Sequence, residues 1–281
     1  QILVGMAMAM LAVRWLWQTL RSDSPTVRAT TATILAIGIF WLGNTRKLSH
    51  GTESLHLFLI LLCLIHGLRC LIADHRRRGL YAGLAALLAT VTFGSGAACF
   101  GAFLVVMVLR REQLRQYVPL LLLAAVGAGL LMTNNHGVLG TKDLELWAHI
   151  DQLLRLLGAP FVWALSPLLD IAHADRQPWA PLRALLHPIA ATTEGAFGPS
   201  LTARWPAALF GAVAVLWLGA QSLAALRYRE PQPRRLFALG IAWFGFGVCL
   251  LIVLARCRFF LGNQDQIVAQ RYLPWSMLLW M

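Results

Sequence analysis

Apolar runs of helix length alternate with short polar segments along almost the whole chain. They lie at about 1–13, 30–43, 54–73, 80–109, 117–133, 153–169, 205–226, 236–255 and from 273 onward. A bilayer-spanning helix needs about 20 apolar residues, whereas a barrel strand alternates with a period of two over about 10 residues. The runs do not alternate, so we predict an all-α, polytopic transmembrane helical bundle of about eight or nine hydrophobic segments.

Both ends of the chain lie within apolar runs. We therefore expect residues 1–281 to form a single integral membrane domain that is truncated at both ends. In hydrocarbon, every backbone N–H and C=O group must be hydrogen-bonded inside the protein, which is why such runs form helices.

The composition supports a membrane protein and indicates which classes of partner to expect. Hydrophobic residues make up 58% of the chain and charged residues 13%, with a formal net charge of +12. The basic residues lie at the ends of apolar runs, which is typical of membrane topology. We therefore expect membrane lipids as partners and no nucleic acid. The histidines and cysteines show no HExxH, HxxxH or CxxC spacing, so neither a metal nor another cofactor is indicated.

Three short loops are dense in arginine, at 74–79, 110–115 and 227–235. Basic loops stay in the cytoplasm, so we place all three on that side. The run at 80–109 then begins and ends on one side. It is too short for two full crossings and long for one. We favour two short helices that meet near Ser95, where Gly94 and Gly96 allow a tight reversal; the alternative is one long, tilted helix.

Counting membrane crossings between the basic loops also bears on the run at 153–169. If this run crossed the membrane and 170–204 did not, the loop at 227–235 would lie outside, against its charge. We expect 153–169 to be re-entrant, because it contains Arg155, Gly158, Pro160 and Pro167. The segment 170–204 is then an external loop. The alternative is a crossing within that segment.

Arg256, Arg258 and Arg271 lie where external residues are expected. Arginines at a helix end often only anchor it at the head groups, with Arg271 pairing with Asp265. The functional alternative is a site for an anionic group, since a planar guanidinium binds phosphate through two hydrogen bonds.

Three segments resemble one known family. Residues 262–272, which read Gly-Asn-Gln-Asp-Gln-Ile-Val-Ala-Gln-Arg-Tyr, follow Arg258 and precede a new apolar run. This segment resembles the "R…G…QA…SRY" segment of bacterial polytopic proteins similar to GT-C-type glycosyltransferases. Residues 92–96 resemble that family's "SxxxG" helix, and Leu156–Pro160 resembles its "LG(A/S)P" segment.

The resemblance implies transfer of a sugar from a polyprenyl phosphate carrier at the outer face of the bacterial inner membrane. It assigns lipid-phosphate binding to Arg258, Arg271 and Tyr272. Glu53 and Asp265 are the candidate catalytic carboxylates. The family's usual acid follows its first helix, which we expect to precede Gln1. Glu53 also suits the first turn of a helix, where the dipole stabilises a carboxylate.

Two other functions fit parts of the sequence. One is a non-catalytic membrane subunit or transporter-like component that binds other membrane subunits. The other is a rhomboid-like intramembrane serine protease, because residues 94–101 and 48–56 resemble segments of that family. A serine nucleophile needs a base within hydrogen-bond reach, and Ser95 with His149 is the candidate pair.

Overall fold

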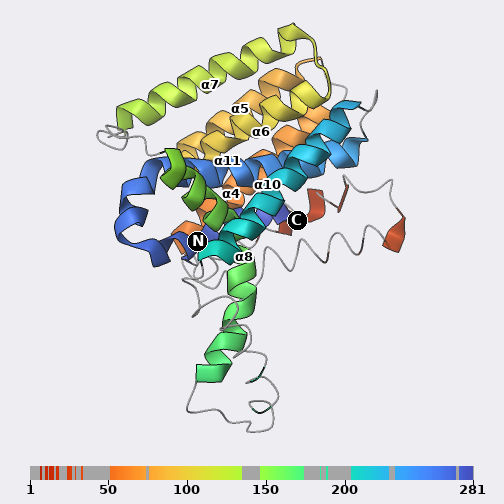
Figure 1. Ribbon diagram of the computed structural model, residues 1–281. Helices are drawn as coiled ribbons and strands as arrows, with labels where there is room; N and C mark the ends of the chain where they lie inside the picture. The colour runs from red at the N-terminus through yellow and green to blue at the C-terminus, as the bar shows by residue number, and fades with distance from the viewer. Residues whose placement is uncertain are drawn as a thin grey trace.

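The computed structural model describes residues 51–73, 76–134, 146–173, 204–227, 232–269 and 272–280, with isolated positions between 7 and 33 and at Ala184 and Pro188. Every regular element among these residues is a helix (Figure 1), which confirms the all-α prediction. The helices are α4 (Gly51–Ile72), α5 (Arg78–Thr92), η2 (Gly94–Ala97), α6 (Ala98–Leu109), α7 (Leu114–Asn134), α8 (Leu146–His173), α10 (Arg204–Arg227), α11 (Pro233–Gly262), η4 (Gln264–Val268) and α12 (Leu273–Trp280).

Four helices are long and apolar enough to cross a membrane, namely α4, α7, α10 and α11. The chain is therefore a membrane protein with transmembrane helices. The helices α5 and α6 are apolar but shorter. Most of the predicted runs at 1–13 and 30–43 lies outside the described residues, so the expected eight or nine segments remain a prediction.

The run at 80–109 forms a helical hairpin, as predicted. Phe93 has an extended backbone, and η2 then carries the chain into α6. Glu112 forms ion pairs with both Arg78, before the hairpin, and Arg110, after it. Arg78 and Glu112 are 34 positions apart, which a straight helix would extend to about 51 Å. The alternative of one long helix is therefore wrong.

The Gly-Ser-Gly turn is closely packed because a glycine occupies its tightest position. A Cβ atom on Gly96 would lie 2.1 Å from the carbonyl oxygen of Ala89, closer than any side chain allows. The sequence signal for a reversal at Ser95 thus reflects a steric requirement of the turn.

The described residues of the three arginine-rich loops lie at one end of the bundle. Arg110 donates to the Leu71 carbonyl at the end of α4. Arg111 donates to the Leu226 carbonyl at the end of α10, at 2.7 Å. Arg235, at the start of α11, donates to the side-chain oxygen of Gln221 at 2.9 Å. We refer to this as the basic end. The predicted grouping is confirmed, and its assignment to the cytoplasm remains a prediction.

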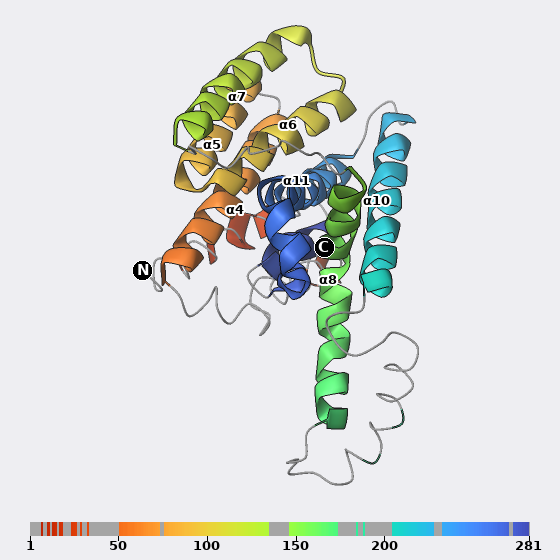
Figure 2. The same ribbon diagram turned by 60° about the vertical axis from the view of Figure 1, so that its left-hand side comes forward.

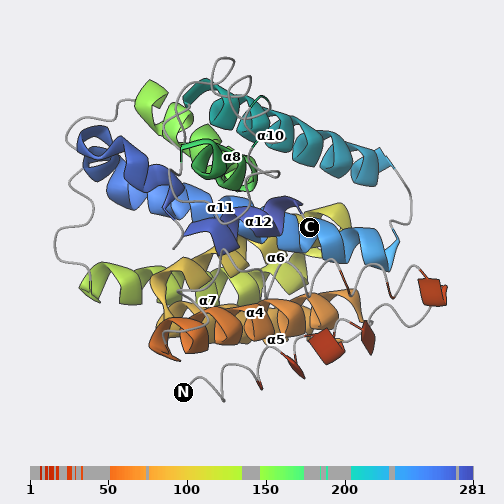
Figure 3. The ribbon, with the colours of Figure 1, turned by 90° about the horizontal axis from the view of Figure 1, so that it is seen from below.

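The prediction that 153–169 is a re-entrant segment is wrong. These residues are the middle of α8, an unbroken helix of 28 residues. A re-entrant segment has to reverse within its own length, which an unbroken helix does not do. Pro160 and Pro167 lie inside this helix, where each removes one backbone hydrogen bond and crowds the carbonyl four residues earlier, yet the helix continues through both. Figure 1 shows that α8 runs across the direction of α11 and that its C-terminal half projects from the bundle, and Figure 3 shows α8 and α10 on the same side of α11.

The predicted external loop at 170–204 falls almost entirely outside the described residues. Apart from Ala184 and Pro188, only its edges are described: residues 170–173 end α8, and Arg204 begins α10. Figure 2 shows these two helices side by side where they pack together.

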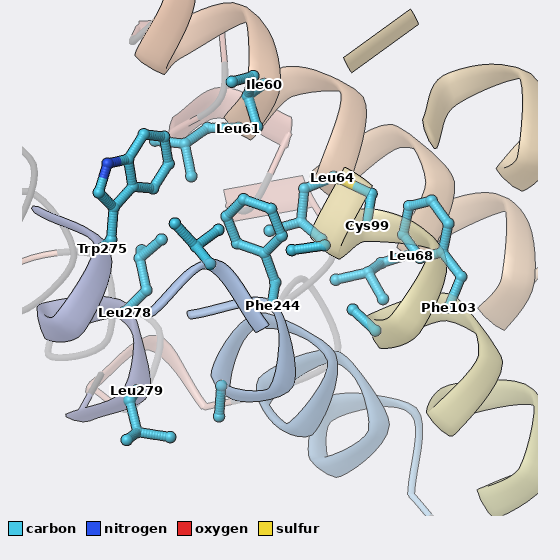
Figure 4. Packing of buried hydrophobic residues seen from close by; sticks show 14 of the residues in the cluster. Ile60, Leu61, Leu64, Leu68, Cys99, Phe103, Phe244, Trp275, Leu278 and Leu279 are labelled. Atoms are coloured by element: carbon cyan, nitrogen blue, oxygen red, sulfur yellow. The ribbon is translucent and has the colours of Figure 1, made fainter. Parts of the chain in front are cut away.

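At the centre of the core, α4, α6, α11 and α12 bring large apolar side chains together (Figure 4). The labelled residues are Ile60, Leu61, Leu64, Leu68, Cys99, Phe103, Phe244, Trp275, Leu278 and Leu279. Because lipid tails are as apolar as these side chains, association of the helices depends on close packing and small residues. This packing holds α12 against α11 and so positions the segment before it.

Candidate functional site

The predicted site residues are only partly described. Glu53 lies in the first turn of α4 and Asp265 in η4, but in both cases only the backbone is described. Arg271 lies outside the described residues. Arg258 is exposed near the end of α11, and Tyr272 is buried directly before α12.

Tyr272 is held by Arg256, for which the sequence left open a membrane anchor or part of an anion site. Nη1 of Arg256 donates to the Tyr272 hydroxyl at 2.9 Å. The Arg256 guanidinium carbon lies 5.9 Å from the centroid of the same ring. Phe260, one turn along α11, meets that ring edge to face at 5.9 Å. These contacts fix the Tyr272 ring at the end of α11, away from the basic end.

A second polar group lies on α8 beside this end of α11. Gln152 and Arg155 are buried, although they lie in an apolar helix. Nε2 of Gln152 donates to the Cys257 carbonyl at 3.1 Å. Its Oε1 atom is buried and has no hydrogen-bond partner among the described residues. An unsatisfied buried acceptor costs roughly 1–3 kcal/mol, which a ligand hydroxyl or a water molecule would offset.

Arg155 brings positive charge into the same region. Its side chain is 4% exposed and lies 3.7 Å from the carboxylate of Asp151, which is 54% exposed. The two residues are four positions apart, so they share one face of α8. Nearby, His149 Nδ1 lies 3.6 Å from the Cys257 sulfur. A charged group buried in a membrane protein is by default a candidate functional residue.

Two of the three family-like segments meet beside this group. The indole N–H of Trp280 donates to the Leu157 carbonyl at 2.9 Å. Ala159 packs in a small buried cluster with Val268 and Leu273. Residues 156–160 of α8 therefore contact both η4 and α12, which flank Tyr272.

The third family-like segment lies elsewhere. Residues 92–96 form the turn of the α5–α6 hairpin, and Gly247 of α11 packs on Ala98 just after it. The structure thus joins the segments 156–160 and 262–272 and does not place 92–96 among the polar residues around Gln152.

The protease-like pair is not formed. The Ser95 hydroxyl is buried in η2 and has no hydrogen-bond partner among the described residues, while His149 contacts Cys257 on α11. A serine nucleophile requires a hydrogen-bonded base, so the two residues do not form a catalytic pair in this structure.

Within the described ranges, no three His, Cys, Asp or Glu side chains lie together as a metal site requires. The arrangement is instead a set of guanidinium, amide, phenol and carboxylate groups at the junction of α8, α11, η4 and α12. We call Asp151, Gln152, Arg155, Arg256 and Tyr272 the junction group. It can bind an anion and accept a hydroxyl hydrogen bond.

Of the junction group, the sequence predicted Tyr272 as a binding residue and left Arg256 open between a membrane anchor and an anion site. Arg155 was predicted only as part of a re-entrant segment. A signal was present, because an amide and an arginine three positions apart in an apolar run place two polar groups on one helix face. Which groups surround Gln152 and Arg155 depends on how the other helices pack against α8.

Comparisons with protein-family models, curated proteins and solved structures found no match for this chain. The resemblance to GT-C-type glycosyltransferases therefore rests on the three quoted segments.

Proposed function

We propose that this protein is a glycosyltransferase-like enzyme of cell-envelope glycoconjugate assembly that uses a polyprenyl-phosphate-linked sugar at the outer face of the bacterial inner membrane. One observation carries the proposal. Arg155 is buried one turn along α8 from Gln152, whose amide oxygen has no hydrogen-bond partner among the described residues, and the two family-like segments pack together nearby at Ala159 and Val268. A lipid-linked sugar phosphate supplies the two complementary groups, a phosphate and sugar hydroxyls.

Phosphate binding follows from the chemistry of the arginines. Arg155 is buried, so its attraction to an anion is less screened by water than that of a surface arginine. Arg258 lies on the last turns of α11, and we retain Arg258, Arg271 and Tyr272 as proposed lipid-phosphate ligands. Arg256 then acts as a positioning residue, because it holds the Tyr272 hydroxyl.

Asp151 joins Glu53 and Asp265 as a proposed catalytic carboxylate. It is partly exposed and already lies near the buried guanidinium of Arg155. In the proposed reaction, an acceptor hydroxyl attacks the anomeric carbon and gives its proton to the carboxylate. The bond from that carbon to the phosphate oxygen breaks, and the arginines stabilise the departing phosphate.

A non-catalytic membrane subunit is the second candidate, and a specific observation favours it. The spans of α7 and α10 are only 17% and 22% buried within this chain. Such apolar faces suit lipid or neighbouring subunits. A subunit would not require the buried charge of Arg155 for lipid-phosphate binding, and this difference can be measured.

The test is binding of undecaprenyl monophosphate to the purified protein in a neutral detergent. Binding is measured by the quenching of tryptophan fluorescence. We expect Arg155→Gln to weaken binding by roughly 10- to 100-fold, as expected for loss of a hydrogen bond to a charged group. Arg155→Lys, which keeps the charge, should retain most of the binding. Arg227→Gln, at the basic end, is the control. Equal binding by the wild type and Arg155→Gln, with both folded, would exclude the phosphate role.

A further inference from the structure

A second cationic site lies at the basic end, far along α11 from the junction group. The turn after α4, the start of α5 and the start of α7 enclose a partly open pocket of about 310 Å³. Arg76, Arg77 and Arg115 line it together with Leu80, Gln116 and Pro119. Three guanidinium groups and two apolar side chains thus surround one hollow.

The buried amide of Gln116 holds the walls of this pocket in place. Its Nε2 atom donates to the Arg76 carbonyl at 2.9 Å, and its Oε1 atom accepts from the Gly79 amide at 3.3 Å. A Cβ atom on Gly79 would lie 2.1 Å from the Gln116 carbonyl oxygen, so the two segments are in direct backbone contact. The pocket is therefore built by packing between helices.

The arginines at this end divide into two groups. Arg78 and Arg110 pair with Glu112, and Arg111 donates to the Leu226 carbonyl. The side chains of Arg76, Arg77 and Arg115 are exposed and form no hydrogen bond or ion pair with any described residue. Glu112, the one described carboxylate at this end, already pairs with Arg78 and Arg110, so no described residue neutralises the three arginines of the pocket.

The helix dipoles add to this field. Both α5 and α7 begin at the pocket, and neither has an acidic residue in its first turn. The positive ends of two helix dipoles therefore point toward the same hollow as the three guanidinium groups. The expected ligand is an anion with several acceptor oxygens, of which a phosphate group is the best match.

We propose that this pocket binds the phosphate head group of an anionic glycerophospholipid from the leaflet at the basic end. The apolar surface beside it favours a lipid over free phosphate. Leu80 and Pro119 form part of the wall, and Val118, Leu121 and Leu122 of the following α7 turns are exposed. Acyl chains can lie along these side chains while the arginines hold the phosphate. Basic pockets between membrane helices bind anionic head groups in this way.

The test is native mass spectrometry of the full chain in a neutral detergent with added phosphatidylglycerol. The variant carries Arg76→Gln, Arg77→Gln and Arg115→Gln. The matched control carries Arg227→Gln, Arg229→Gln and Arg234→Gln, which remove three charges from another loop. We expect roughly 100-fold weaker lipid binding for the pocket variant, from the usual contribution of three basic residues, and less than a threefold change for the control.

Arg115→Gln alone is the second variant, because its side chain forms no contact that folding requires; it should weaken binding by several-fold. Unchanged binding in the pocket variant, or an equal loss in the control, would overturn the proposal. So would displacement of the lipid by low millimolar inorganic phosphate, which would show a site for free phosphate. Equal binding of phosphatidylcholine would also overturn it, since that lipid carries no net charge.

Discussion

Gly158 of α8 and Gly211 of α10 lie where the backbones of these two helices touch. A Cβ atom on Gly158 would be 1.9 Å from the Ala207 carbonyl oxygen, and one on Gly211 would be 1.8 Å from that of Leu154. Small residues at both positions allow the close approach. This contact positions α8, and therefore Gln152 and Arg155, against the rest of the bundle.

The first prediction concerns this contact. Gly211→Ala should lower the midpoint of thermal unfolding, because the added methyl group would overlap backbone that cannot move aside. We expect a loss of about 1–3 kcal/mol, as for other overpacked sites. Gly219→Ala is the control on the same helix, since a Cβ atom there would meet nothing within 4 Å. An equal midpoint for both variants would contradict the backbone contact between α8 and α10.

The second prediction concerns the hairpin. Glu112→Gln should destabilise the protein by about 3 kcal/mol, because it leaves Arg78 and Arg110 without their shared carboxylate. The side chain of Glu112 is 2% exposed, so water cannot replace it. Gln113→Ala, in the same loop, should change stability little. Unfolding in detergent, followed by circular dichroism, compares the two variants.

The third prediction concerns Ser95. Ser95→Ala should leave stability unchanged or raise it slightly, because the hydroxyl is buried without a hydrogen-bond partner among the described residues. A fluorophosphonate probe, which labels activated serines, should not react with the wild-type protein. Labelling of the wild type that disappears in Ser95→Ala would restore the protease hypothesis.

The fourth prediction concerns orientation. A cysteine at Asn263 should react with a membrane-impermeant maleimide added from outside the cell, whereas a cysteine at Arg115 should react only after the membrane is opened. Both residues are exposed, and they lie at opposite ends of the bundle. The wild type, whose cysteines at 63, 99, 249 and 257 are buried, gives the background. The reverse pattern would contradict the cytoplasmic placement of the basic end.

The fifth prediction concerns Tyr272. Tyr272→Phe removes the hydroxyl that Arg256 binds but keeps the ring that packs on Phe260. We expect a loss of about 1 kcal/mol in stability, the usual contribution of one hydrogen bond. Arg256→Gln should give a similar loss, and the double variant should not add the two effects, because both remove one interaction. Additive losses would show that the two side chains act independently.

The sequence alone determined the helical membrane class, the grouping of the three basic loops and the hairpin turn at Ser95. These depend on local properties: the length of apolar runs, the charge at their ends and the glycines of the turn. Tertiary structure decided that α8 is unbroken, that Gln152 faces α11 and that Arg155 is buried. It also paired Arg256 with Tyr272. Such contacts join residues more than 100 positions apart, as in the bond between Gln152 and Cys257, or depend on how a loop folds back. Helix periodicity gives the face of a residue, and only packing gives its partner.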